Sequence, residues 1–226
     1  MLKGVGFDFG NVIGIFNTSE WLEFVKHHRG NCRRPEEMFS GDMLQVILAF
    51  DRGGMSDVEF YSRIRTAYRM SIPTLRDFYD KLGKILSIDW EMVGLVQNLR
   101  KRGVATFLVT NINSFHARYI RQNFPEVFPS FDYCMISCEE GIIKPEPEAY
   151  IRPLEILGLK SEDCIFIDDS WSNIKAACRL GYKGWHFNST DNIFLQNGKI
   201  NEEREKLINL ISVLDEQGLL YDKTRH

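Results

Sequence analysis

The chain has 226 residues, 44% of them hydrophobic, which is enough for a packed core and for one domain with an insertion. Its formal net charge is −3 and it carries no long basic run, which argues against a nucleic-acid-binding protein. No apolar run approaches the ~20 residues of a membrane span, and no signal-peptide core precedes the first strand pattern, so the sequence predicts a soluble cytoplasmic protein with neither nucleic acid nor membrane as partner.

The first predicted element is a short apolar strand within residues 3–13 that ends in an acidic residue. Burial of Val5 and Phe7 would fix the strand, so that Asp8 lies at its carboxyl end, directly before a loop that contains glycine. In an open α/β sheet this end of the strands is where ligands bind. Asp8 is therefore the first candidate functional residue, although a single carboxylate there can also just cap the loop that follows.

Residues 14–86 carry helical patterns and no strand pattern. The expected start of each helix is marked by a capping residue or a proline: Thr18 or Ser19, Pro35, Ser56 and Pro73. The aromatic residues recur at helical spacing, which is typical of the core of a helical unit rather than of a surface that stacks on a substrate. Four helices between the first strand and the next predict an inserted helical cap.

From residue 91 onward helices and strands alternate. The predicted order, with a polar loop at 188–201, is helix 91–102, strand 104–110, a helix from 114, strand 132–137, helix 148–157, strand 164–168, helix 172–180, strand 182–187 and helix 202–214. Continuous apolar strands are typical of a parallel sheet buried on both faces. The alternation predicts an α/β fold with a doubly wound parallel sheet, whose domains are an α/β core at 1–14 and 88–226 and a helical cap at 15–87.

Two later predicted strands are also followed by polar side chains, just as the first predicted strand is followed by Asp8. Thr110 and Asn111 end one run, and Asp168 and Asp169 end another. Because the carboxyl ends of parallel strands share one edge of the sheet, the acidic residues are expected to converge there. Converging carboxylates repel one another unless a proton or a cation joins them, and Mg²⁺ prefers oxygen ligands and binds substrate phosphate.

Lys144 lies between Gly-Ile-Ile and Pro-Glu-Pro, a setting that predicts a rigid loop holding the amine inward. There it would act as a point charge that neutralises a phosphate and the nearby carboxylates. Thr110 and Asn111 would donate to a phosphoryl oxygen from the hydroxyl and from the amide groups of the turn. Each residue alone could be a strand-end cap or a surface residue, so the combination carries the prediction.

Four stretches, in this order, resemble the motifs of the haloacid dehalogenase-like hydrolase superfamily over residues 1 to about 190. They are the stretches around Asp8, Thr110, Lys144 and Asp168-Asp169. The resemblance implies a Rossmann-like core of that superfamily with an inserted all-helical cap. It also implies that Asp8 is the nucleophile, Thr110 the motif hydroxyl, Lys144 the motif lysine and Asp168-Asp169 the acidic metal motif.

The metal site implied by this resemblance uses Asp8, Asp169 and the main-chain carbonyl of Gly10 as direct ligands of Mg²⁺, with Asp168 acting through a bound water. Most phosphatases of the superfamily carry a second Asp, a general acid and base, at the position that Gly10 occupies here. The form Asp-Phe-Gly-Asn-Val resembles a bacterial sugar-phosphatase branch in which Gly replaces that Asp. The missing acid predicts poor cleavage of primary alkyl phosphates, unless a cap residue or a water replaces it.

The sequence thus predicts a Mg²⁺-dependent phosphatase that hydrolyses a small phosphorylated metabolite, such as a sugar phosphate, through an aspartyl-phosphate on Asp8. One alternative is a metal-independent hydrolase of the dehalogenase type, which also lacks the second Asp; the pair Asp168-Asp169 argues against it. Another is a catalytically weak binding or regulatory protein on the same fold, for which Gly10 is the main support. The sequence indicates no oligomeric state.

Overall fold

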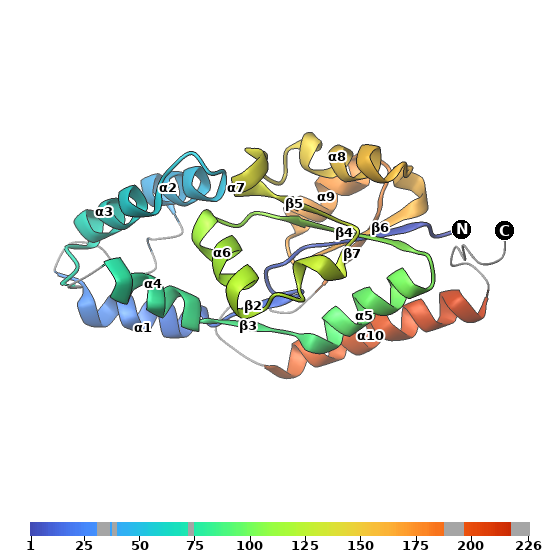
Figure 1. The fold of residues 1–226 in the computed structure, drawn as a ribbon, viewed down its shortest axis with the longest axis horizontal. Helices are drawn as coiled ribbons and strands as arrows, with labels where there is room; N and C mark the ends of the chain where they lie inside the picture. The colour runs from blue at the N-terminus through green and yellow to red at the C-terminus, as the bar shows by residue number, and fades with distance from the viewer. Residues whose placement is uncertain (31–36, 38–39, 72–74, 188–196, 218–226) are drawn as a thin grey trace.

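A five-stranded parallel sheet forms the centre of the computed structural model, which describes residues 1–30, 37, 40–71, 75–187 and 197–217. The strand order is β5-β4-β1-β6-β7, and all neighbours pair in parallel. The strands are β1 (Gly4–Phe7), β4 (Ala105–Thr110), β5 (Tyr133–Ile136), β6 (Cys164–Asp168) and β7 (Lys183–His186). The predicted α/β fold with a doubly wound sheet is confirmed (Figure 1).

The register of the sheet brings the ends of its three central strands together. Phe7, the last residue of β1, pairs with Leu108 of β4 and with Ile167 of β6. Gly6 allows the neighbouring aromatic rings to cross β1, because a Cβ at this position would lie 2.3 Å from the ring of Phe107. The residues that follow the three paired positions therefore share one edge of the sheet.

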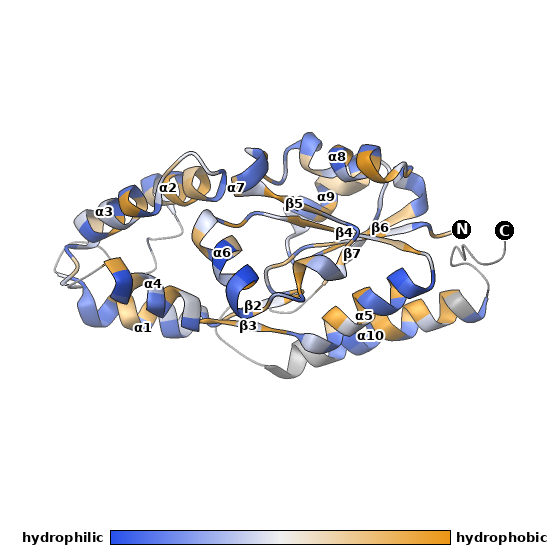
Figure 2. Cartoon of the chain, in the orientation of Figure 1, coloured by the Kyte–Doolittle hydropathy of each residue, from blue (hydrophilic) through white to orange (hydrophobic). Residues whose placement is uncertain are grey.

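Helices cover both faces of the sheet because alternate residues of a strand point to opposite faces. One face packs against α5 (Trp90–Lys101), α6 (Ser114–Asn123) and α10 (Asn197–Glu216). The other packs against α8 (Pro147–Leu157) and α9 (Trp171–Arg179). Figure 2 shows apolar residues along the strands and on the helix sides turned toward them. The short α7 (Ser137–Glu140) directly follows β5.

The cap has a hydrophobic core of its own. It consists of α1 (Thr18–His28), α2 (Gly41–Asp51), α3 (Asp57–Tyr68) and α4 (Leu75–Lys84). Its buried residues include most of the aromatic side chains that recur in the sequence: Trp21, Phe50, Phe60, Tyr61, Tyr68, Phe78 and Tyr79. The predicted helical cap and the packing role of its aromatic residues are confirmed (Figure 1).

A short antiparallel ribbon joins the core to the cap. It pairs β2 (Gly14–Phe16) with β3 (Leu86–Ile88). The sequence analysis expected no strand within 14–86, because strands of three residues are too short to show an alternating pattern. We propose that the boundary between the two domains falls in this ribbon, close to the predicted limits of the cap at 15–87.

Several predicted element boundaries need correction. The first helix is capped by Asn17, which accepts the N–H of Glu20 at 3.1 Å, rather than by Thr18 or Ser19. The predicted cap at Ser56 is confirmed by its bond from the N–H of Glu59 at 3.2 Å. Residues 197–201 of the predicted loop belong to α10. The helix starts predicted at Pro35 and Pro73, and residues 188–196 of that loop, lie outside the described residues.

Among the helices that the structure describes, none combines the length and the apolarity that crossing a membrane requires.

Candidate active site

Asp8 lies directly after β1, at the edge where the three central strands end. Its side chain is buried, and its backbone N–H donates to the carbonyl of Ile167 at 2.8 Å, which extends the pairing of β1 with β6. The N–H of Phe9 donates to Asp8 Oδ1 at 2.6 Å. The first bond fixes the backbone of Asp8, and the second orients its carboxylate.

Asn11 links the loop after Asp8 to the acidic pair. Its φ of 55° lies in the left-handed region, which Asn tolerates better than most residues. Its side-chain amide donates to Asp169 Oδ2 at 2.9 Å. The sequence analysis gave Asn11 no role of its own. A glycine-containing turn favours Asn in this conformation, but the partner lies 158 residues further along the chain and leaves no local signal.

Lys144 lies between two of the predicted acidic residues. Its Nζ is 2.6 Å from Asp8 Oδ1 and 2.7 Å from Asp168 Oδ2, and only 3% of the residue is exposed. The inward direction predicted for this amine is what the structure shows. The lysine is therefore placed to balance the charge of both carboxylates.

Asn111 holds the backbone of this lysine. The side-chain Nδ2 of Asn111 donates to the carbonyl of Lys144 at 3.0 Å, and the N–H of Lys144 donates to Asn111 Oδ1 at 2.7 Å. The sequence analysis had assigned Asn111 to substrate phosphate. Its side chain positions Lys144. The contact that the sequence analysis predicted, from the amide groups of the turn to a phosphoryl oxygen, stays a prediction.

Asp168 and Asp169 have different surroundings although they are adjacent. Asp168 is fully buried and accepts bonds from the N–H of Ser170 at 2.8 Å, from Asn173 Nδ2 at 3.1 Å and from Lys144. Asp169 is partly exposed and accepts a bond from Asn11. Asp169 is thus more accessible to a ligand than Asp168. The sequence analysis did not identify Asn173.

The carboxylates of Asp8, Asp168 and Asp169 form one cluster. One oxygen atom from each lies within 4.8 Å of the others. Burial raises the pKa of Asp8 to about 8, with Lys144 acting in the opposite direction and the other two carboxylates adding to the rise. Burial also raises the pKa of Asp169, against the hydrogen bond from Asn11. Burial would lower the pKa of Lys144, but the charges of Asp168 and Asp8 outweigh it and raise that pKa.

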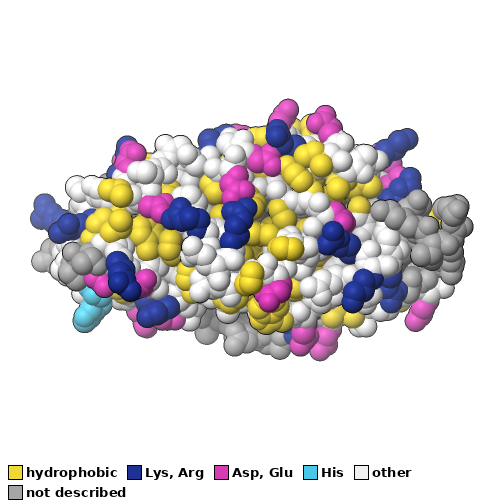
Figure 3. Space-filling model, in the orientation of Figure 1, with side chains coloured by type: hydrophobic (Ala, Val, Ile, Leu, Met, Phe, Trp, Pro, Cys, Tyr) yellow, Lys and Arg dark blue, Asp and Glu magenta, His cyan; other side chains and the backbone are white. Residues whose placement is uncertain are grey.

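The charge balance of this cluster fits a divalent cation. Among the described residues, three carboxylates face a single lysine, which leaves an excess of negative charge that a hard cation with oxygen ligands would neutralise. On the face shown in Figure 3, by contrast, acidic and basic side chains are interspersed. The buried cluster therefore concentrates charge of one sign in a way that this face does not.

Thr110 and Gly10 complete the set of predicted site residues. Thr110 is the last residue of β4, is buried, and lies two positions beyond the residue that pairs with Phe7. A Cβ built on Gly10 would meet only Asp8 Oδ2 and Phe16 at 4.0 Å, which is ordinary contact, and Gly10 is not among the glycines with positive φ. The backbone therefore does not require glycine at position 10.

The turn after α2 brings the cap onto the loops of the core. Asn113 Nδ2 donates to Asp51 Oδ1 at 3.2 Å, and Ser137 Oγ donates to the carbonyl of Asp51 at 2.6 Å. Gly53, with φ of 79°, packs so closely on α7 that a Cβ would lie 2.3 Å from the carbonyl of Cys138. The last residue of a cap helix thus lies over the segment that follows Thr110.

Arg52 forms a second contact between cap and core. It donates to Glu146 at 2.5 and 3.1 Å and to the carbonyl of Gly141 at 2.9 Å. Glu146 is two residues beyond Lys144 and also accepts the N–H of Ile143 at 3.2 Å. The cap therefore contacts the loop that follows Thr110 and the loop that carries Lys144.

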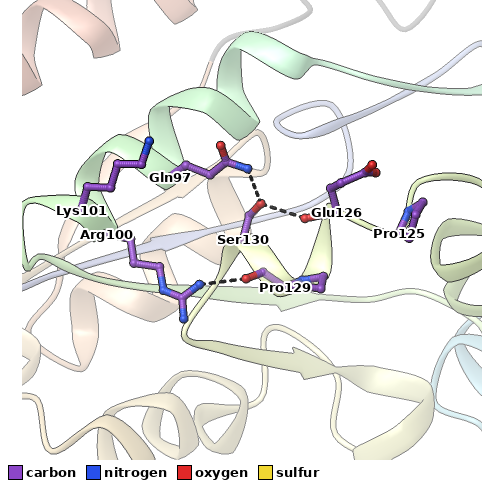
Figure 4. A pocket seen from close by; sticks show the side chains of 7 residues that line it. All are labelled: Gln97, Arg100, Lys101, Pro125, Glu126, Pro129 and Ser130. Carbon is purple, nitrogen blue, oxygen red and sulfur yellow. Dashed lines mark hydrogen bonds between the residues drawn. The ribbon is translucent and has the colours of Figure 1, made fainter.

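A surface pocket elsewhere on the core has no part in this cluster. It lies between α5 and the short helical turn Phe128–Ser130 (Figure 4). Gln97 donates to Ser130 Oγ at 2.9 Å, and Arg100 donates to the carbonyl of Pro129 at 2.8 Å. The charged residues that line it, Arg100, Lys101 and Glu126, are of both signs, so this pocket differs from the acidic cluster.

Comparison with known proteins agrees with the geometry. The description "haloacid dehalogenase-like hydrolase" belongs to a family model that matches residues 59–181, more than half of the chain. The chain therefore belongs to the haloacid dehalogenase-like hydrolase family, as its motifs predict.

Individual relatives have different activities. Bifunctional epoxide hydrolase 2 of Rattus norvegicus is 36% identical over 98 residues, which are 42% of this chain and only 18% of the rat protein. D-ribitol-5-phosphate phosphatase of Bacteroides thetaiotaomicron is 23% identical over 189 residues, 81% of this chain and 90% of that protein. A crystal structure of a HAD family enzyme from Bacteroides thetaiotaomicron, in complex with magnesium and inorganic phosphate, has a TM-score of 0.72 at 23% identity and covers 85% of this chain and 97% of that one.

Proposed function

We propose that the protein is a Mg²⁺-dependent phosphatase that acts on a small phosphorylated metabolite, such as a sugar phosphate. The observation that carries this proposal is the convergence of Asp8, Asp168 and Asp169 around Lys144 at the carboxyl edge of the sheet. The similarity to D-ribitol-5-phosphate phosphatase supports the substrate class, and the magnesium and phosphate held by the crystallised relative support the cofactor.

The residues that would hold Mg²⁺ are Asp8, Asp169 and the carbonyl of Gly10, with Asp168 acting through a water. Mg²⁺ at this position supplies positive charge that neutralises the phosphoryl oxygens and fixes their orientation. Lys144 would balance the charge of Asp8 and of the phosphoryl group, and the hydroxyl of Thr110 would donate to a phosphoryl oxygen.

Asp8 would act as the nucleophile. Its Oδ1 already accepts bonds from Phe9 and Lys144, which orient the carboxylate. A carboxylate oxygen forms a bond to phosphorus while the bond to the leaving oxygen breaks, and water then hydrolyses the aspartyl-phosphate. Contacts of Asp51 and Arg52 with the core would keep the cap over the site and limit the access of bulk water during these steps.

A metal-independent hydrolase of the dehalogenase type is the second candidate, because Gly10 is compatible with it as well as with the phosphatase. Its carboxylate attacks carbon and needs no cation. Asp168 and Asp169 argue against it, because two further carboxylates beside Asp8 would then have, in the described part of the chain, only Lys144 as counter-charge. The phosphatase therefore remains the better match to the charge of the site.

A screen of phosphorylated metabolites with Mg²⁺ tests the proposed function. Sugar phosphates, sugar-alcohol phosphates and an aryl phosphate are each expected to release inorganic phosphate in a Mg²⁺-dependent manner, at different rates. The matched control is Asp8→Asn, which keeps the size of the side chain. No phosphate release from any member of the panel, with haloacid hydrolysis instead, would replace the phosphatase by the second candidate.

The link from Asn11 to Asp169 gives a separate prediction. Asn11→Gly keeps the left-handed backbone at little steric cost but removes the amide that bonds to Asp169. Since partners that orient a ligand typically contribute about 10–100-fold to metal affinity, the Mg²⁺ concentration for half-maximal activity is expected to rise by this factor. Activity titrated with Mg²⁺ measures it. An unchanged half-saturation point would mean that Asn11 does not orient a metal ligand.

A further inference from the structure

Phe16 is an aromatic residue that lies beside the proposed nucleophile and that no step above uses. A Cβ built on Gly10 would lie 4.0 Å from Phe16 Cε2 and also 4.0 Å from Asp8 Oδ2. Apart from the chain neighbours of Gly10, these are the only two atoms of the described residues within 4 Å of this point. The ring of Phe16 and the carboxylate of Asp8 therefore border the same space, into which a side chain at position 10 would extend.

This space lies on the accessible side of the Asp8 carboxylate. The bonds from Phe9 and Lys144 both go to Oδ1, so within the described part of the chain they leave Oδ2 available to attack phosphorus. Lys144, which bonds to Oδ1, is buried, whereas Gly10 and Phe16, which border the space beside Oδ2, are both partly exposed. The alcohol part of a substrate bound at Asp8 can therefore extend past Gly10 and along Phe16.

Packing and strand pairing hold the ring of Phe16 in place. The ring lies edge to face with Phe9, with centroids 6.2 Å apart, and with His116, with centroids 5.2 Å apart. Phe16 is also the last residue of β2 and pairs with Leu86 of β3. A ring fixed in this way offers a preorganised surface, which binds a ligand without a further cost of ordering the side chain.

The surface that Phe16 offers is apolar and its ring neighbours are uncharged. Phe9 is buried. Burial lowers the pKa of His116 to about 4, so this imidazole is neutral near neutral pH, and its Nε2 lies 3.4 Å from the carbonyl of Leu82 in the cap. An alcohol beside Phe16 therefore meets the carbon atoms of a ring, which favour a face of C–H groups over a row of hydroxyl groups.

We propose that Phe16 is a specificity-determining residue whose ring forms an apolar wall for the alcohol part of the substrate. The proposal rests on the proposed phosphatase function and narrows its substrate class. The preferred phosphate esters carry, close to the ester oxygen, a ring with a face of C–H groups, as in a cyclic sugar or a phenyl group. Such a face packs on Phe16, whereas an open-chain polyol carries hydroxyl groups along its length. Phe16 itself takes no part in making or breaking bonds.

A matched pair of substrates tests the proposal: the phosphate ester of a methyl hexoside, whose ring cannot open, and that of the open-chain hexitol, both at a primary hydroxyl. The wild type is expected to have the higher kcat/KM for the cyclic ester. Phe16→Ala should lower this value by about 10-fold or more and change that of the open-chain ester little, because a single methylene group in an apolar pocket already changes kcat/KM by about 10–200-fold. Phe16→Tyr keeps the ring and should keep the preference.

Phenyl phosphate is the third substrate. Since its ring also has an apolar face, its kcat/KM should fall in Phe16→Ala and be retained in Phe16→Tyr. Whichever of the two ring esters loses more in Phe16→Ala identifies the ring that the wall fits better.

Phe128→Ala is the matched control. Phe128 is also partly exposed, and its ring packs on Phe9 with centroids 6.4 Å apart, but it is not among the atoms that a Cβ on Gly10 would meet. Its loss removes a ring from the same cluster and should leave the ratio of the two kcat/KM values unchanged. Inorganic phosphate has no alcohol part, so it should inhibit wild type, Phe16→Ala and Phe128→Ala equally.

Phe16→Leu keeps the proposal testable if Phe16→Ala does not fold. Phe16 packs against the hydrophobic clusters of both the core and the cap, and leucine retains apolar volume there but has no flat ring. It should lower the preference for the cyclic ester in the same direction. The same ratio of kcat/KM values in wild type, Phe16→Leu and Phe16→Ala would overturn the role of Phe16, as would a wild-type preference for the open-chain ester. If the wild type hydrolyses none of the esters, the proposed function itself fails, which is a separate result.

Discussion

Asp8→Asn is expected to reduce phosphate release to background, a loss of about 10⁴-fold or more, because the amide cannot attack phosphorus. The substitution keeps the shape of the side chain, and its oxygen can still accept the bonds that Phe9 and Lys144 now donate. Steady-state turnover of the best substrate from the metabolite screen measures the loss. Binding of beryllium fluoride with Mg²⁺, which mimics an aspartyl-phosphate, should be lost in parallel.

The control for Asp8→Asn is a carboxylate at the opposite edge of the same sheet. Asp163 precedes β6 and pairs with Lys3 at 2.7 Å, at the amino ends of the strands. Asp163→Asn should keep turnover and beryllium fluoride binding, since it removes a similar charge far from the cluster. Substantial activity in Asp8→Asn, with the protein folded by circular dichroism, would place the nucleophile on another residue.

Much of the site could be predicted from sequence because parallel strands deliver their next residues to one edge. The apolar runs before Asp8, Thr110 and Asp168 identify buried strands, and any order of those strands in one sheet brings the three residues to the same side. The central position of β1, which makes Asp8 a neighbour of both other ends, depends on pairing between distant segments. The local sequence pattern does not indicate this order of the strands.

The residues that support the site could not be predicted for a related reason. Asn11, Asn173 and the side-chain role of Asn111 depend on hydrogen bonds between loops that are far apart in the chain. Asn is common in turns for purely local reasons, so its presence there is a weak signal. The position of Asp51 depends in addition on how the cap docks on the core. The contacts of Gly53 and Ser137 that determine this docking are not visible in the helical pattern of the sequence.

Removal of divalent metal is expected to abolish phosphate release by the wild type. Among the residues that the structure describes, only Lys144 pairs with the cluster of Asp8, Asp168 and Asp169. Without a cation, the substrate phosphate would therefore add further negative charge to an uncompensated site. Excess chelator should remove the activity, and Mg²⁺ or Mn²⁺ added back should restore it. Full activity in chelator would instead support the metal-independent dehalogenase type.

Substitution of single carboxylates extends this prediction to individual ligands. Asp169 is partly exposed and has one bond from Asn11, so Asp169→Asn should raise the Mg²⁺ concentration for half-maximal activity by at least about 10-fold, with partial recovery at high Mg²⁺. Asp168 is fully buried and bonds to Lys144 and Asn173, so Asp168→Asn should lower activity at every Mg²⁺ concentration by disturbing Lys144. Mg²⁺ titrations of both variants, with Asp163→Asn as control, separate these effects. If Asp169→Asn showed the wild-type Mg²⁺ dependence, Asp169 would not be a metal ligand, and the cation would have to be held by Asp8 and Asp168.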